Sequence, residues 1–127
     1  GESDGERTER LRALAAAALP LWGVIPTPEG EAYGLDTLRF TALCRLELPA
    51  VAHVVADVEA LGPRLAQMCL GFGADELHAQ VVSERALRLG DNAASTVLLR
   101  KEAVTLIRGA GLTPAERVAN DVLEDVT

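Results

Sequence analysis

Residues 53–73, HVVADVEALGPRLAQMCLGFG, contain a strand followed by a helix, and this unit decides the expected fold. The apolar run from His53 to Val58 has the length of a buried strand. Gly62 and Pro63 then occupy the N-cap and N1 positions that suit them, so a helix begins there, and two glycines stop it. The unit predicts a parallel α/β fold. The residues expected on the buried side of its helix are Leu65, Met68, Cys69 and Phe72.

The segment before this unit has the same alternation of helix and strand. A helix is expected over residues 7–19, where Pro20 stops it, and an apolar run of strand length follows at residues 21–25. Asp36 is a good N-cap for a second helix over residues 37–48. The residues expected to face the core from the two helices are Leu11, Leu14, Ala15, Ala18, Leu19, Leu38, Ala42, Leu43 and Leu46.

The segment after residue 73 continues the pattern less regularly. It predicts a strand over residues 76–82, a short helix beginning at residues 83–85 and a polar loop at residues 90–95. A last helix is expected over residues 98–110, and the chain from Leu112 onward is expected to be extended. Alternating helices and strands with short loops favour right-handed crossovers between parallel strands.

Length, composition and charge limit the protein class. With 127 residues, 49% of them hydrophobic, the chain has the size of one domain, so we expect a lead-in over 1–5, a single α/β domain over 6–118 and a tail over 119–127. A net charge of -7 argues against nucleic acid or anionic lipid as a partner. Because no apolar run approaches the roughly 20 residues that span a bilayer, and the chain starts with acidic residues, we expect a cytoplasmic protein without a membrane partner.

Two sets of residues in this order form a specific pattern. The first set is 34–39, 45–46, His53, 61–62, 66–67, 72–75, 81–82 and Glu84, and the second is 106–108, 110–111, Pro114 and 116–117. The first set closely resembles the last strands and helices of aminofutalosine synthase and dehypoxanthine futalosine cyclase, radical S-adenosylmethionine (SAM) enzymes of the menaquinone-forming futalosine pathway. The second set resembles the family's C-terminal LIREAG-x-x-P-x-ER signature.

The resemblance implies a partial TIM-barrel-like fold of about three parallel strands with helices on their outer face. The family binds a [4Fe-4S] cluster through a Cys-x-x-x-Cys-x-x-Cys motif, whereas this chain has only Cys44 and Cys69, so we expect no cofactor. Substrate-side positions also differ from the family. Val58 stands where the family favours an aromatic residue, and Asp75-Glu76 stands where it favours Asn-Asp. Few aromatic side chains remain to stack a ring.

Polar residues near the carboxyl ends of the expected strands are the candidate ligand-binding residues, because barrel sites gather at that edge. A metal or catalytic site is not predicted, since the two histidines lack a ligand spacing and no third ligand is evident. A solvated or structurally hydrogen-bonded role is the alternative for each residue. The candidates are Thr27, Glu29, Asp57, Glu59, Gln80 and Glu84.

A three-stranded parallel sheet with helices on one face leaves its other face uncovered, so we expect a homodimer or a partner chain to cover it. Three functions remain open. The preferred one is a non-catalytic accessory or interaction module derived from the end of a radical SAM barrel. The alternatives are a subunit that completes a split radical SAM enzyme in trans, and a protein that binds a small nucleoside-like ligand.

Overall fold

The structure, a computed structural model, describes residues 3–27, 34–82, 98–119 and 122–125. They form two compact units, the first from Gly1 to His78 and the second from Ala79 to Thr127. Compact units are not by themselves separate domains, so the expected division into 1–5, 6–118 and 119–127 stays a prediction. Within the described residues, no helix combines the length and the apolar character needed to cross a membrane.

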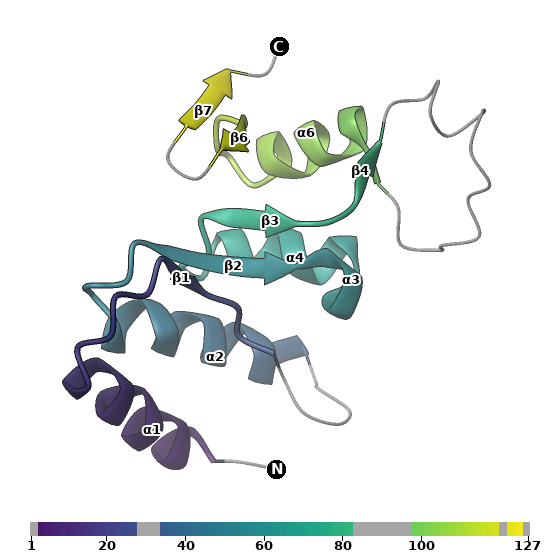
Figure 1. The fold of residues 1–127 in the computed structure, drawn as a ribbon. Helices are drawn as coiled ribbons and strands as arrows, with labels where there is room; N and C mark the ends of the chain where they lie inside the picture. Colours follow the sequence, from purple (N-terminus) through teal and green to yellow (C-terminus); the bar gives the residue numbers. More distant parts are fainter. Residues whose placement is uncertain (1–2, 28–33, 83–97, 120–121, 126–127) are drawn as a thin grey trace. The chain divides into compact units, whose positions relative to one another are not determined.

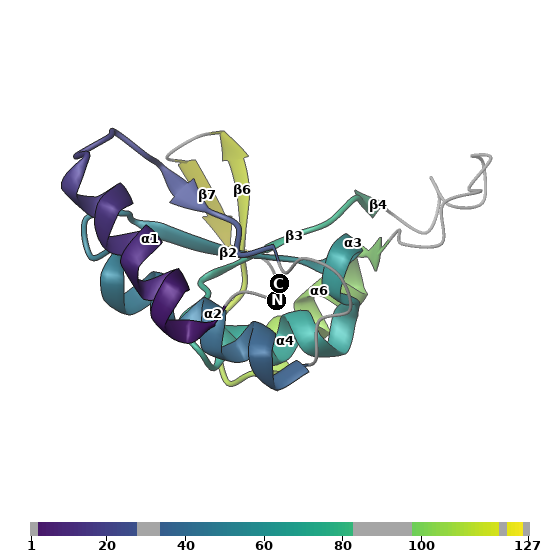
Figure 2. The same cartoon turned by 90° about the horizontal axis from the view of Figure 1, so that it is seen from below.

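The first unit is an α/β layer (Figure 1). Its strands form one parallel sheet in the order β1-β2-β3, in which Gly23 pairs with His53, and Asp57 with His78. Helices α2 and α4 pack on β2 and lie on the same side of the sheet (Figure 2). The elements are α1 (Asp4–Ala16), β1 (Gly23–Val24), α2 (Gly34–Glu47), β2 (His53–Asp57), α3 (Val58–Leu61), α4 (Pro63–Leu70) and β3 (Glu76–His78).

This arrangement confirms a mixed α/β fold with a three-stranded parallel sheet and helices. The described residues contain no closed barrel, so the partial TIM-barrel-like fold stays an expectation. The strand expected in the quoted stretch is present as β2, and Pro63 stands at the start of α4 after Gly62, as predicted. Val54 and Ala56 of β2 are buried, together with Ala66 and Cys69 of α4.

Helix α1 differs from the prediction at both ends. It begins at Asp4, inside the expected lead-in, because Ser3 and Glu6 form a reciprocal capping box that satisfies the first backbone N–H groups. It ends at Ala16 and is followed by Ala18 at a φ of 51°. Of the apolar stripe predicted for it, Leu11 alone is buried, and the other buried residue of the helix is Arg7.

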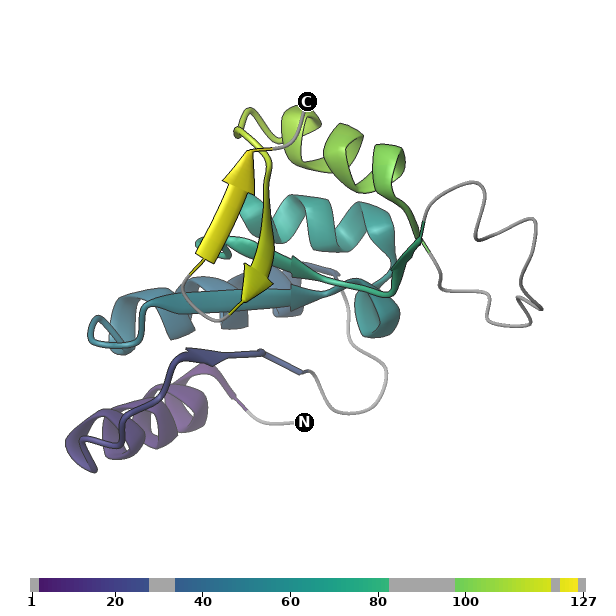
Figure 3. The ribbon, with the colours of Figure 1, turned by 45° about the horizontal axis from the view of Figure 1, so that its top comes forward.

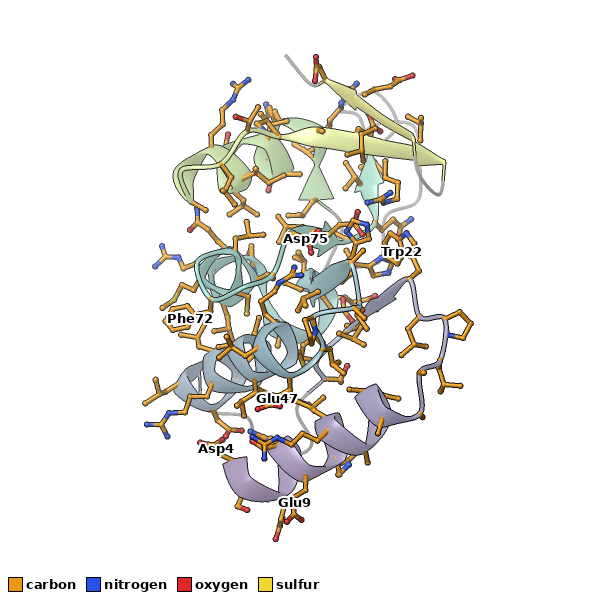
Figure 4. The ribbon with its side chains drawn as sticks, turned by 90° about the vertical axis from the view of Figure 1, so that its left-hand side faces the viewer. Asp4, Glu9, Trp22, Glu47, Phe72 and Asp75 are labelled. Atoms are coloured by element: carbon orange, nitrogen blue, oxygen red, sulfur yellow. The ribbon has the colours of Figure 1, made fainter. Side chains whose placement is uncertain are left out.

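Helices α2 and α4 bury only part of the stripes predicted for them, with Leu38 and Cys69 buried as expected. Because α2 begins at Gly34, Asp36 lies in its first turn instead of capping it, and Leu46 is 73% exposed. In α4, Met68 is exposed while its neighbour Cys69 is fully buried, and Phe72 beyond the helix end is also exposed (Figure 4). Apolar spacing alone did not distinguish the core side of these helices, because both carry apolar residues on more than one face. The buried residues of α2 are Thr37, Leu38, Thr41 and Cys44.

The described part of the second unit consists of one helix and two pairs of short strands. Strands β4 (Val81–Val82) and β5 (Leu98–Leu99) pair in parallel, and α6 (Arg100–Gly109) follows directly. The predicted strand over 76–82 is therefore two strands in two sheets, and residues 98–99 are a strand instead of helix. The extended tail is paired: β6 (Ala115–Ala119) and β7 (Val122–Asp125) lie side by side and antiparallel (Figure 3). The predicted helix at 83–85 and loop at 90–95 lie outside the described residues.

Candidate functional site

Polar side chains gather where β2 and β3 begin, and we name Arg45, His53 and Asp75 the amino-edge cluster. Asp75, which directly precedes β3, is its centre (Figure 4). Oδ1 of Asp75 accepts hydrogen bonds from the backbone N–H of Val54 at 2.8 Å and from Arg45 Nη2 at 2.9 Å. Oδ2 lies 2.6 Å from Nδ1 of His53. One carboxylate therefore links the starts of two neighbouring strands to helix α2.

Arg45 extends the cluster to two loop carbonyls. Its Nε donates to the carbonyl oxygen of Gly73 at 2.8 Å, and its Nη1 donates to that of Ala52 at 3.3 Å. Gly73 has a φ of 112°, and a Cβ added there would lie 2.8 Å from Cβ of Arg45. Both the backbone conformation and the close approach require glycine at this position. The cluster therefore fixes the entry of the chain into β2 and into β3.

An aromatic contact joins β1 to the same cluster. The ring of Trp22 lies 4.5 Å from the ring of His53, centre to centre, at a tilt of 34°. Gly23 permits this approach, since a Cβ on it would lie 3.0 Å from the carbonyl oxygen of His53. All three strands of the first unit are thus connected at their amino ends. In a barrel-type sheet this is the end associated with stability, not with chemistry.

The candidate residues predicted from the sequence belong to the opposite, carboxyl edge. Asp57 is the last residue of β2, and its Oδ1 accepts the backbone N–H of Glu59 at 3.0 Å, which caps helix α3. Glu59 is exposed on that helix. Thr27 lies beyond β1, and its hydroxyl donates to the carbonyl oxygen of Ile25 at 3.1 Å. The described hydrogen bonds of Thr27 and Asp57 are therefore local.

Of the remaining candidates, the structure describes Gln80. Gln80 belongs to the second unit, where its carbonyl oxygen accepts the N–H of Leu98 at 3.0 Å and its side chain is exposed. Glu29 and Glu84 lie outside the described residues. The structure adds His78, which is exposed at the end of β3 and is the register partner of Asp57. Asp57 and His78 are therefore neighbours on adjacent strands at this edge.

The cysteines are buried thiols in the helical layer. Burial raises the pKa of Cys44 to about 11 and also raises the pKa of Cys69, so both thiols are protonated near neutral pH. The hydroxyl of Thr41 lies 3.6 Å from the sulfur of Cys69. Among the residues that the structure describes, no three His, Cys, Asp or Glu side chains are grouped to hold a metal ion.

The sequence assigned no site role to the amino-edge cluster, although all three residues are part of the resemblance. Two features pointed to it: an aspartate between a glycine-ended helix and a strand, and an arginine late in the preceding helix. Neither pattern specifies that the two side chains meet. Their contact depends on how α2 and α4 pack beside β2, which spacing along the chain does not determine.

The chain is similar to known enzymes over most of its length. No family model matches the chain. Over 86 residues, which are 68% of the chain, it is 33% identical to aminodeoxyfutalosine synthase of Thermus thermophilus. Over an alignment of 130 positions, covering 92% of the chain, it is 31% identical to cyclic dehypoxanthine futalosine synthase of Streptomyces coelicolor. The chain is related to the futalosine-pathway enzymes.

The relationship covers only part of those proteins. The chain spans 23% of the Thermus protein and 32% of the Streptomyces protein. It is also 33% identical, over 66% of its length, to a 5-amino-6-(D-ribitylamino)uracil–L-tyrosine 4-hydroxyphenyl transferase of Methanopyrus kandleri. Similarity at this level therefore extends to relatives that act on different substrates, and it indicates a common framework more strongly than a common reaction.

Proposed function

We propose that this chain is a non-catalytic framework module, derived from the end of a radical SAM barrel, that packs against further barrel strands. Those strands belong either to a partner polypeptide or to a second copy of the chain, as in a homodimer. The observation that carries the proposal is the amino-edge cluster. Its side chains bind the three strands and α2 to one another, and all of its members belong to the residues that resemble the family.

The carboxyl edge supports the same proposal from the opposite side. Catalysis in a barrel needs polar groups that point toward a substrate from several strands. Here Asp57 caps a helix and Thr27 bonds to its own loop, so each of these groups is used locally. The chemistry of the proposed barrel would then come from the strands that this chain packs against.

A chimera tests the proposal directly. In the chimera, this chain replaces the segment of the Streptomyces coelicolor relative that aligns with it. A truncated form of the same relative, which ends before that segment, is the comparison. Thermal unfolding and product formation are measured for both. If this chain is a framework module, the chimera should unfold cooperatively. It should also form product, because the replacement removes no catalytic group.

Two outcomes would contradict the framework assignment. A chimera that aggregates like the truncated protein would show that this chain does not complete the barrel. A chimera that folds but is inactive would show that the replaced segment supplies more than framework. Adding this chain separately to the truncated protein tests completion in trans, and light scattering on the chain alone tests the homodimer.

A small-ligand site is the second candidate, and the register of Asp57 with His78 favours it. The two side chains lie on neighbouring strands at the edge where barrel ligands bind. A carboxylate beside an imidazole suits a nucleoside-like ligand with hydroxyl and ring-nitrogen groups. Thermal-shift measurements with nucleosides, with His78→Ala as the control, would support this candidate only if stabilisation occurs and is lost in the variant.

A further inference from the structure

Helix α1 is attached to the first unit in a different way from the other helices. It packs along α2, and of its thirteen residues only Arg7 and Leu11 are buried. Leu11 is thus its one buried apolar side chain. Because burial of apolar area is the main source of packing stability, a helix with so little of it must be held largely by other interactions.

Two ion pairs supply those interactions. The guanidinium of Arg7 binds both carboxylate oxygens of Asp36, at 2.7 and 2.9 Å, and lies 4.6 Å above the ring of Phe40. Arg12 binds Glu47 at 3.1 and 3.4 Å. Figure 4 shows Glu47 on the side of α2 that faces α1. These pairs join α1 to the first and last turns of α2.

Cys44 lies between the two pairs. Positions 36, 40, 44 and 47 of α2 follow one another at intervals of four, four and three residues, which places them on one helical stripe. The side chain of Cys44 is 2% exposed, and the positive charge of Arg7 acts on its thiol. The stripe of α2 that carries the two ion pairs therefore has a buried thiol between them.

We propose that α1 is an electrostatically held strap that opens without unfolding the α/β sheet and, when open, exposes Cys44 to thiol reagents. Segments with few buried apolar contacts open locally at a lower free energy than the whole fold. The Arg12–Glu47 pair, whose arginine side chain is 68% exposed, weakens as salt screens it. Access to Cys44 is accordingly controlled by ionic strength, whereas access to a thiol in the α2–α4 layer is not.

Cys69 provides the matched control. It is fully buried on α4, beside Thr41 of α2, and has no place on the stripe that faces α1. The test uses two single-thiol proteins, Cys69→Ala and Cys44→Ala, and follows reaction with a chromogenic disulfide at low and at high salt. We expect Cys44 to react about tenfold or more faster than Cys69 in native conditions, and salt to accelerate Cys44 alone.

Charge variants test whether the Arg12–Glu47 ion pair holds α1 in place. In the Cys69→Ala protein, Arg12→Gln and Glu47→Gln should each raise the rate at Cys44 about threefold, the size expected for an exposed pair. Arg64→Gln, an exposed change on α4, should leave it unchanged. Urea unfolding of the same proteins should hardly differ, because the sheet is not affected. Equal rates at the two thiols, or a Cys44 rate that ignores both salt and the charge variants, would overturn the proposal.

Discussion

The amino and carboxyl ends of the first unit's strands differ in how far their polar contacts reach. At the amino ends, the side-chain hydrogen bonds of Asp75 join residues that are 21 to 30 positions apart in the chain. At the carboxyl ends, the hydrogen bonds of Thr27 and Asp57 span two positions each. Long-range contacts restrict tertiary structure, while local contacts shape only a turn or a helix end. The amino ends thus carry contacts that connect distant parts of the first unit, whereas the described hydrogen bonds of Thr27 and Asp57 do not.

The largest expected effect comes from adding one methyl group at the amino ends. Gly73→Ala combines a positive φ with a Cβ only 2.8 Å from that of Arg45, and it should destabilise the protein by about 3 kcal/mol. Gly62→Ala is the control at the other end, because its φ is also positive but nothing lies within 4 Å of the added Cβ. It should cost about 1 kcal/mol. If urea unfolding shows the same loss of stability for both variants, the close packing at Gly73 is contradicted.

A second pair of variants compares the two aspartates. Asp75→Ala removes hydrogen bonds from Val54, Arg45 and His53 and should cost about 2 kcal/mol. Asp57→Ala removes one N-cap bond and should cost about 1 kcal/mol. Denaturant midpoints measure both. If Asp57 proves the more important of the two, the distinction between the two ends is wrong.

The first turn of α2 gives a comparison that depends on pH. Hydrogen bonding to Arg7 lowers the pKa of Asp36 below its ordinary value of 3.8. A carboxylate whose folded-state pKa is lowered stabilises the fold above the unfolded value, and that contribution is lost as the pH falls through the lowered pKa. Asp36→Asn should therefore be less stable than the natural protein at neutral pH, and the difference should shrink below pH 3.8. A constant difference in urea midpoint would rule out this linkage.

The smallest effect is expected at the exposed carboxyl-edge positions. His78→Ala and Glu59→Gln should each change stability by no more than about 0.5 kcal/mol, because both residues are exposed. Calorimetry of these two variants and of Asp75→Ala would measure the stability lost at the carboxyl ends and at the amino ends of the strands. A loss at His78 as large as that at Asp75 would mean that the register pair with Asp57 is a structural contact.

Strand β2 and the start of helix α4 were the parts of the fold most accessible from sequence. The apolar run of β2 and the Gly62–Pro63 pair each carry a local signal, so β2 and α4 were placed correctly. Helix faces were not predictable from spacing. Met68 of α4 and Phe72 beyond its end have the four-residue spacing of a buried stripe, yet both are exposed and Cys69 is buried instead.

The candidate site shows the same limit. Residues after strand ends were selected because ligands gather there, and Asp57 does stand at the end of β2. The sequence could not reveal that its carboxylate caps α3, since that helix of four residues has no periodic pattern of its own. His78 was placed in a longer strand over 76–82, and the shorter β3 makes it a strand end.

Arg45 also has a consequence for how this protein and its relatives change length during evolution. Its guanidinium binds the carbonyl oxygens of Ala52 and Gly73 and the carboxylate of Asp75 at once, so the loops before β2 and β3 are fixed to the same side chain. An insertion in either loop would shift a bonded group out of reach. Insertions and deletions in the first unit should therefore collect in the loops after its strands, and an alignment of many relatives would show that asymmetry.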